Sequence, residues 1–267
     1  MIKVNDEEYM HSSFFHECEN ANTIVIFIHG ILESPTQFEY LAKSAFKNRF
    51  SVSGILLDGH GCSAEEFSKS SLKKWIDSVD RELESHRNKY ENIIIVGHSM
   101  GSLLCINAYM NLHYRDKIKS MVLIGTPLNV WVKPKMIKSS IKIVLNNVKE
   151  SDFLTYEAHK AFSVKSTSLF TYIKWIPRYL DLFILINRTK KNLSGLDIPM
   201  LIVHGVSDEL VSCRSLDTFT KKIKHKNYKV IRLENSGHFY YDKNDLKSFI
   251  NEFNQFLDQS LKNVYLN

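Results

Sequence analysis

The chain has 267 residues, of which 44% are hydrophobic and 24% are charged, and it carries a formal net charge of +6. This is an ordinary soluble composition, long enough for one α/β domain with an insertion or for two domains. No apolar run is long enough to span a bilayer. The acidic start, MIKVNDEEYM, lacks the basic-then-apolar order of a signal peptide. We therefore expect a cytoplasmic protein.

The positive charge is concentrated in one segment. Residues 127–197 contain 12 lysines and arginines against five aspartates and glutamates, a net charge of +7, whereas the rest of the chain has a net charge of −1. This distribution argues against a protein that coats nucleic acid and indicates one distinctive insertion. We expect no nucleic-acid partner.

The four cysteines, Cys18, Cys62, Cys105 and Cys213, are scattered through the sequence with no CxxC spacing. Neither a zinc site nor a disulfide framework is indicated. We expect free thiols that are partly buried, and we expect the protein to need no metal.

Apolar strand-like runs alternate with amphipathic helical stretches along most of the chain. The expected strands are Thr23–Ile28, Ser53–Leu57, Ile93–Val96, Ser120–Ile124, Pro199–Val203 and Tyr228–Leu233. Helices are expected at Phe38–Phe46, Leu72–Lys89, from Ser99 to about Leu112, and at roughly Lys243–Leu261. Fully apolar strands that alternate with helices predict an α/β fold with a mostly parallel sheet covered by helices on both faces.

In such sheets, ligands bind beyond the carboxyl ends of the strands. Ser99 follows one expected strand, Asp208 follows another, and His238 follows the last one. A serine, an acid and a histidine in this chain order are what an α/β-hydrolase requires. A serine needs a histidine base to become a nucleophile, and the histidine needs an acid to orient it.

The stretch IIIVGHSMGS places Ser99 between two glycines, straight after a strand. A polar residue in an ordinary turn is the alternative, but the strand before it and the helix after it favour a nucleophile elbow. Gly97 and Gly101 leave room in the sharp bend, where side chains would collide. His98, inside the elbow, is interpreted as a positioning residue rather than as the base.

Two backbone N–H groups are needed for an oxyanion hole, and the natural donors are those of Met100, after the nucleophile, and of Ile31. Ile31 follows His29 and Gly30 at the end of the first strand, where His29 is also interpreted as a positioning residue.

Spacing alone does not choose the acid. Asp208 and Glu209 are nearly tied, with Glu234 as a third candidate. Asp58 follows an early strand and is interpreted as structural, bracing the turn Gly59–Gly61.

The motifs FIHGILES, LDGHGCS, VGHSMGS, VHGVSDELV and NSGHF resemble the successive motifs of the α/β-hydrolase superfamily, most of all its monoacylglycerol lipase and carboxylesterase branch. The likeness covers roughly residues 24–124 and 199–257. It implies Ser99 as nucleophile, Asp208 as acid, His238 as base, and Ile31 and Met100 as oxyanion donors. Ser102 departs from the family, which usually has a second glycine there.

The resemblance also implies a cap inserted after the sixth strand. We expect a core of residues 1–126 and 198–267 and a helical cap (lid) of residues 127–197. The later half of the cap is rich in apolar residues, namely Phe170, Ile173, Trp175, Ile176, Tyr179, Leu180, Phe183 and Ile184. The main expectation is that the cap buries this apolar face, with its side towards Ser99 forming an acyl-chain pocket. Transient contact of the basic cap with an anionic membrane surface is a further alternative.

Together these features predict a serine hydrolase that cleaves carboxylic esters with apolar acyl groups through an acyl-enzyme, without metal or organic cofactor. A thioesterase or acyltransferase, or a C–C bond hydrolase, would use the same triad. A ligand-binding protein that kept the fold and lost turnover is the alternative from another class.

Overall fold

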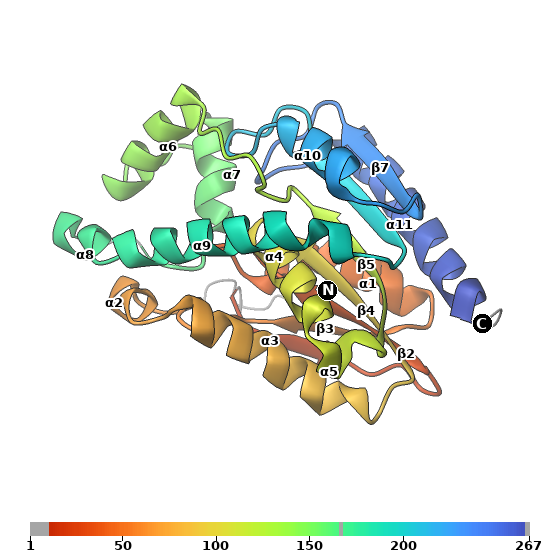
Figure 1. Ribbon diagram of the computed structural model, residues 1–267. Coiled ribbons are helices and arrows are strands. Elements are labelled where there is room, and N and C mark those ends of the chain that lie inside the picture. Colours follow the sequence, from red (N-terminus) through yellow and green to blue (C-terminus); the bar gives the residue numbers. More distant parts are fainter. Residues whose placement is uncertain (1–10, 166–167, 265–267) are drawn as a thin grey trace, which may run out of the picture.

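The computed structural model describes residues 11–165 and 168–264; the acidic start that we interpreted above, residues 1–10, lies outside them. Its centre is a seven-stranded sheet in the order β1-β3-β2-β4-β5-β6-β7 (Figure 1). The strands are β1 (Phe14–His16), β2 (Thr23–Ile28), β3 (Ser51–Ile55), β4 (Asn92–His98), β5 (Ile118–Ile124), β6 (Met200–Gly205) and β7 (Tyr228–Leu233). β1 runs antiparallel to β3, and all other neighbouring strands are parallel.

The helices of the core follow the strands in the expected alternation. They are α1 (Glu39–Lys47), α2 (Ala64–Ser68), α3 (Leu72–Arg87), α4 (Met100–Met110), α5 (Leu112–Arg115), α10 (Arg214–Lys222) and α11 (Lys243–Val264). The six expected strands and four expected helices are all present, with ends displaced by a few residues. The short elements β1, α2, α5 and α10 were not predicted.

Both faces of the sheet are covered, as the apolar strands predicted. In β2, Ile24, Ile26 and Ile28 point into one core cluster, while Val25 and Phe27 point into the other. The first cluster includes residues of α3 and α4, and the second includes residues of α1 and α11. This alternation follows from the period of two along a strand.

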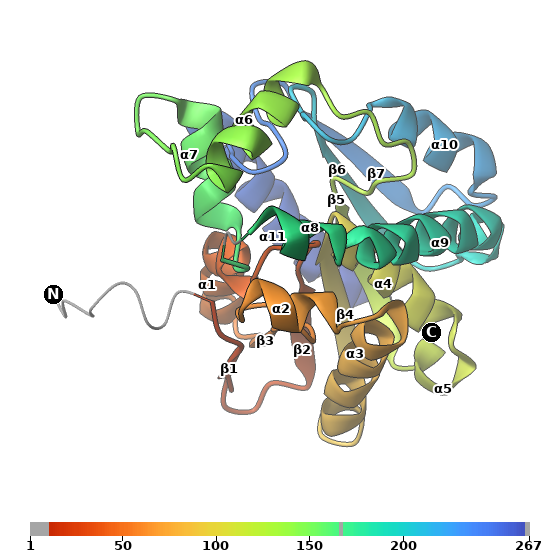
Figure 2. The ribbon, with the colours of Figure 1, turned by 90° about the vertical axis from the view of Figure 1, so that its left-hand side faces the viewer.

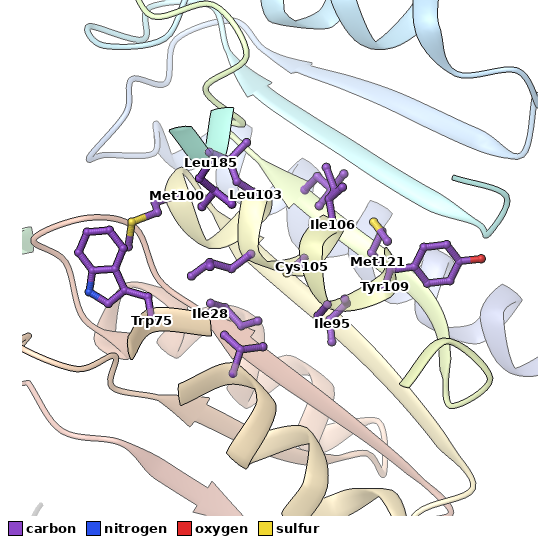
Figure 3. Packing of buried hydrophobic residues seen from close by; sticks show 14 of the residues in the cluster. Ile28, Trp75, Ile95, Met100, Leu103, Cys105, Ile106, Tyr109, Met121 and Leu185 are labelled. Atoms are coloured by element: carbon purple, nitrogen blue, oxygen red, sulfur yellow. The ribbon is translucent and has the colours of Figure 1, made fainter. Parts of the chain in front are cut away.

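The helix that begins at the expected elbow is buried on almost every side. Residues Met100–Cys105 are all buried, and the cap residue Leu185 packs near Met100 and Leu103 (Figure 3). A helix that is apolar all round belongs in the interior of a protein. The packing therefore fixes the position of the residue that precedes this helix, Ser99.

Four α-helices lie between β5 and β6 among the described residues, in the segment 127–197 that is called the cap here; its role as a lid stays a prediction. Its helices are α6 (Pro134–Val144), α7 (Phe153–Ala161), α8 (Leu169–Ile173) and α9 (Ile176–Asn192). In the described chain the insertion follows the fifth strand, β5, and not a sixth. α6 packs on α7, whereas α8 packs on α2, and α9 packs on α3 and α4 (Figure 2). The insertion thus has two halves, α6–α7 and α8–α9, and the second half packs on helices α2, α3 and α4 of the core.

The expectation that the later half of the insertion buries its apolar face is wrong for most of its residues. Phe170 is 80% exposed, and the others are exposed too, namely Ile173, Ile176, Tyr179, Leu180, Phe183 and Ile184. Trp175 alone among the named residues is buried; its ring packs edge-on against Phe67, and its N–H donates to the Ala64 carbonyl. The physical reason is that α9 turns a different stripe inward, which contains Leu185 and Ile186.

All four cysteines are free thiols, as expected: Cys18 and Cys105 are buried, Cys213 is half-buried and Cys62 is exposed. Among the helices of the described residues, none combines the length and the apolar character that crossing a membrane demands.

Candidate active site

Ser99 lies at the sharp bend between β4 and α4, with φ 49° and ψ −120°. A positive φ is uncommon for a residue with a side chain, and such strain is concentrated at functional sites. Both flanking glycines are required by space. A Cβ on Gly97 would lie 2.5 Å from the backbone of Gly101, and a Cβ on Gly101 would lie 1.9 Å from the Ile28 carbonyl oxygen. The sequence pattern therefore does form the expected strand-to-helix elbow.

Ser102, the departure from the family pattern, connects two strands. Its buried O–H donates to the carbonyl oxygens of Gly97 at 2.7 Å and Ile124 at 3.1 Å. The same oxygen accepts the N–H of Ile124 at 3.2 Å. The ends of β4 and β5 are thus joined directly beneath the elbow.

Asp208 and His238 meet beyond the ends of β6 and β7. The Nδ1–H of His238 donates to Asp208 Oδ2 at 2.7 Å, and both side chains are almost fully buried. The other carboxylate oxygen of Asp208 accepts the N–H groups of Leu210 at 2.8 Å and Val211 at 2.7 Å. With its Nδ1 engaged in this way, the ring of His238 has Nε2 left for proton transfer.

Asp208 and Glu209, which spacing alone left tied, differ in what they contact, and Asp208 as the catalytic acid stays a prediction. Glu209 does not touch the imidazole nitrogens; its Oε2 accepts the backbone N–H of His238 at 3.0 Å. Glu234, the third candidate acid, is exposed.

Glu33, which was not predicted from the sequence, is a buried carboxylate at the centre of the site. Its Oε2 accepts the N–H of Gly30, Nδ1–H of His98 and the side-chain amide of Gln37, each at 2.8 Å. Its Oε1 lies 4.0 Å from Nε2 of His238. The sequence contained one signal for Glu33: in FIHGILES it is an acid shortly after the carboxyl end of an expected strand.

Glu33, His238 and Asp208 shift one another's pKa values, because each lies close to an opposite charge. Burial alone would raise the pKa of Glu33, but the neighbouring His98 and His238 outweigh it and lower that pKa to about 2. Burial opposes the charged form of His238 as well, yet Asp208, Glu33 and Glu209 raise its pKa above the ordinary value. The same pairing and the two backbone N–H groups lower the pKa of Asp208 against the effect of burial. The site therefore stabilises an imidazolium.

His98, expected as a positioning residue, lies between the elbow and the base. Its ring centroid is 4.7 Å from that of His238, and its Nδ1 is held by Glu33. Gly125, with φ 56°, passes close to both rings, since a Cβ there would lie 3.5 Å from each.

The loop that carries Ile31 is fixed from several sides. The Nδ1–H of His29 donates to the Gly30 carbonyl, and its Nε2 accepts the Leu57 N–H at 3.0 Å. Burial lowers the pKa of His29 to about 4, so this imidazole is neutral. His60 Nε2 accepts the N–H of Leu32 at 3.1 Å.

Within the described part of the chain, the N–H groups of Ile31 and Met100 make no hydrogen bond to a protein acceptor. Orphan donors of this kind at a helix start and in a loop are what an oxyanion hole requires. A Cβ on Gly30, the residue before Ile31, would lie 2.9 Å from Ser99 Cβ, so the loop that carries Ile31 passes directly beside the serine.

The Ser99 hydroxyl makes no hydrogen bond within residues 11–165 and 168–264, and Ser99 is 7% exposed. Catalytic hydrogen bonds are often long without substrate and tighten in the complex. The turn that contains Asp58 is held through its backbone, because the Asp58 carbonyl accepts hydrogen bonds from Ser70 and from Trp75. The side chain of Asp58 lies 3.6 Å from the ammonium group of Lys74, and the bracing role expected of it stays a prediction.

Glu33, His98 and His238 are the one set among the described residues whose ligand atoms, all within 4.8 Å of one another, are spaced to hold a metal ion. A metal bound there would occupy His238, the histidine that is expected to act as the base.

A cavity of about 470 Å³ lies elsewhere, between α9 and the segment that leads into α6. Its lining includes Leu128, Trp131, Phe183, Lys190 and Arg214, and it includes no triad residue. This cavity is not the acyl-chain pocket expected beside Ser99, which remains a prediction.

Comparison with known proteins places the chain in a family. The family model described as "Serine aminopeptidase, S33" (Hydrolase_4) matches residues 19–242. The chain belongs to this family. The Hydrolase_4 match spans the whole sheet from β2 to β7 and includes Ser99, Asp208 and His238.

Proteins of similar sequence include a lipase and proteins named as putative esterase/lipases. The chain is 25% identical over 231 residues to the thermostable monoacylglycerol lipase of Bacillus sp. (strain H-257), covering 82% of this chain and 84% of that protein. It is 23% identical over 280 residues to "Putative esterase/lipase 2" of Mycoplasma genitalium, covering 99% and 100% of the two chains. The protein is thus an α/β-hydrolase related to ester hydrolases.

Solved structures show the same fold at lower identity. The monoacylglycerol lipase of Paleococcus ferrophilus superposes with a TM-score of 0.65 at 16% identity, over 91% of this chain and 98% of that one. A structure from the work on the metagenome-derived lipolytic enzymes LipS and LipT gives a TM-score of 0.74 at 17% identity, over 94% and 98%. These likenesses confirm the α/β-hydrolase fold.

Proposed function

We propose that this protein is a serine ester hydrolase with Ser99 as nucleophile, His238 as general base and Asp208 as the acid that orients it. The observation that carries the proposal is the buried 2.7 Å contact between Asp208 and His238, beyond the ends of β6 and β7. A second feature supports the proposal: Ser99 has a positive φ and lies in an elbow flanked by two glycines. An ordinary turn serine would need neither feature.

In the proposed reaction, His238 Nε2 takes the proton of the Ser99 hydroxyl as its oxygen attacks the ester carbonyl. The N–H groups of Ile31 and Met100 hold the negative oxygen that develops, and the N-terminus of α4 adds its dipole. The imidazolium returns the proton to the leaving alcohol. Water then releases the acid from the acyl-enzyme by the same sequence of proton transfers.

For the substrate, we propose carboxylic esters with apolar acyl groups, of the monoacylglycerol kind. The support is the relationship to a monoacylglycerol lipase and to esterase/lipase proteins. The family description also names an aminopeptidase, so an aminoacyl amide belongs among the substrates to be compared.

The test is hydrolysis of p-nitrophenyl esters of increasing acyl length, with an aminoacyl p-nitroanilide and an acyl-CoA beside them, by the wild type and by Ser99→Ala. We expect ester hydrolysis that peaks at one acyl length and falls by a factor on the order of 10³ or more in the variant. Near-native esterase activity in folded Ser99→Ala would contradict the triad. Faster turnover of the acyl-CoA or the anilide would reassign the substrate class.

We further propose that the outer face of the cap touches an anionic membrane surface. Large apolar side chains are exposed on α6, α8 and α9, among them Ile141, Phe170, Leu180 and Phe183. The segment from 127 to 197 also carries the net charge of +7 noted above. Exposed apolar side chains interspersed with cations are typical of a surface that binds the interface of an anionic bilayer.

A further inference from the structure

Glu209 is a fully buried carboxylate next to the proposed triad acid, and its two oxygens face different parts of the molecule. Oε2 accepts the backbone N–H of the base, His238, at 3.0 Å. Oε1 lies 3.2 Å from the ammonium group of Lys135, which comes from α6 of the cap. One side chain therefore links the cap to the residue that carries the catalytic imidazole.

The backbone around this link is joined in the same way. The segment that leads from β5 into α6 runs antiparallel beside residues 207–212, with Val130 paired to Val211. The N–H of Trp131 donates to the Leu210 carbonyl at 2.9 Å, and that of Lys133 donates to the Glu209 carbonyl at 2.8 Å. The entrance to α6 is thus held on the loop that contains Asp208.

Side chains of α6 and α7 reinforce this attachment. The small apolar cluster of Met136, Ile143 and Ala158 packs against Leu210 and Phe239. Each of these two residues lies next to or near a triad position: Leu210 follows Asp208 by two, and Phe239 follows His238 directly. The α6–α7 half of the cap therefore rests on the acid and base loops.

We propose that Glu209 is a positioning residue for His238 and that Lys135 of the cap completes it, so that the α6 half of the cap sets both the place and the basicity of the catalytic imidazole. This inference rests on the proposed serine-hydrolase function. It assigns to Glu209 a role distinct from that of Asp208, because Glu209 acts through the backbone of His238 and through its charge.

The charges of Glu209 and Lys135 act on the pKa of His238 in opposite directions. A negative carboxylate near His238 stabilises the imidazolium, and a cation beside that carboxylate offsets part of this effect. The groups that face His238 are Asp208, Glu33, His98 and His204, and Tyr240 faces Glu209. Removing the Glu209 charge should lower the pKa of His238, whereas removing Lys135 should raise it.

The experiment measures the pKa of His238 by NMR of histidine-labelled protein, with its signal assigned by its loss in His238→Gln. The variants are Glu209→Gln and Lys135→Met, with Lys138→Met as the matched control, an exposed lysine one turn along α6. Glu209→Gln keeps one oxygen acceptor for the His238 N–H, removes the negative charge and places an amide NH2 where Oε1 faces Lys135. Lys135 is half exposed, so its variant tests the link without disturbing the core.

We expect Glu209→Gln to lower the pKa of His238 by about half a pH unit or more, and Lys135→Met to raise it. The acidic limb of kcat/KM should move in the same two directions. In Glu209→Gln, kcat should fall with KM nearly unchanged, since Glu209 touches the base and not the substrate. Lys138→Met should leave the pKa where it is.

Shifts in the same direction for both variants, or shifts no larger than that of Lys138→Met, would overturn the proposal. The NMR titration does not depend on turnover. A failure of the proposed function would appear instead as ester hydrolysis that survives Ser99→Ala, so the two failures are distinguishable.

Discussion

At the scale of single residues, Glu33 shows how a charge is tolerated in the interior of the site. Its carboxylate is almost fully buried, which costs several kcal/mol unless hydrogen bonds and opposite charges compensate. Three N–H donors surround one of its oxygens. The arrangement fixes the His98 ring against His238 and holds the Gly30 loop beside Ser99.

We predict that Glu33→Gln lowers kcat/KM by roughly ten- to a hundredfold, because hydrogen bonds to a buried charged group contribute about 1.5–3 kcal/mol. Glu33 raises the pKa of His238, so its neutral replacement should lower that pKa. More of the enzyme then has a neutral base at acidic pH, and the acidic limb of the pH–rate profile should move to lower pH.

The measurement is kcat/KM against pH for wild type, Glu33→Gln and Glu91→Gln. Glu91 is an exposed acid just before β4, at the end of that strand opposite to Ser99. An acidic limb that stays in place in Glu33→Gln would show that this carboxylate does not act on His238.

At the scale of elements, β4, the elbow and α4 form one unit whose geometry depends on backbone contact. The Gly101 Cα approaches the end of β2 so closely that a Cβ would lie 1.9 Å from the Ile28 carbonyl oxygen and 2.7 Å from that of His29. The Ile28 oxygen cannot move without disturbing the sheet, because Ile28 is paired on both sides.

We therefore predict that Gly101→Ala destabilises the protein by about 3 kcal/mol or more, at the upper end of overpacking costs. Gly195→Ala is the matched control, since its nearest neighbour would be the flexible end of Met110 at 3.1 Å. Urea unfolding of the two variants beside wild type measures the difference. Equal free energies of unfolding would mean that the elbow does not depend on close approach at Gly101.

The elements also show what the sequence could predict. Strands such as Thr23–Ile28 were found within a residue or two because buried strands are continuous apolar runs. The elbow was predictable because a strand, two glycines and a helix constrain one another. β1, with three residues, is too short for periodicity to identify.

Other features depend on tertiary structure. Spacing alone could not choose between Asp208 and Glu209; the family resemblance favoured Asp208, and the direction of each side chain now separates the two acids. In the cap, apolar residues such as Phe170 and Phe183 predicted burial, since periodicity identifies an apolar face but not what covers it.

At the scale of the whole molecule, the cap is divided between two supports. The α6–α7 half rests on the acid and base loops, while α8 and α9 rest on α2, α3 and α4. Ser163, between the halves, donates to the carbonyl oxygens of Leu32 and Glu33 beside the expected oxyanion hole. The cap is therefore attached to every loop that supplies a proposed catalytic group.

The exposed apolar side chains of the cap lead to a prediction about membranes. We expect the protein to sediment with vesicles that contain phosphatidylglycerol, and less with purely zwitterionic vesicles or at high salt, since surface attraction to anionic lipid is screened by salt. The double variant Phe170→Ser and Phe183→Ser should reduce binding severalfold.

The control for vesicle binding is Leu112→Ser, which removes a side chain that is 77% exposed on α5, outside the cap. An equal loss of binding in this control, or no binding by the wild type, would reject the cap as the contact surface.

If Ser99 is an activated nucleophile, it should react with a fluorophosphonate, which modifies serines of this kind. The folded protein is incubated with the reagent at several pH values, and the modified residue is located by peptide mass spectrometry. We predict one phosphonyl group on Ser99, absent in Ser99→Ala and formed much more slowly in His238→Gln. Modification at another residue, or none in the folded wild type, would contradict the account.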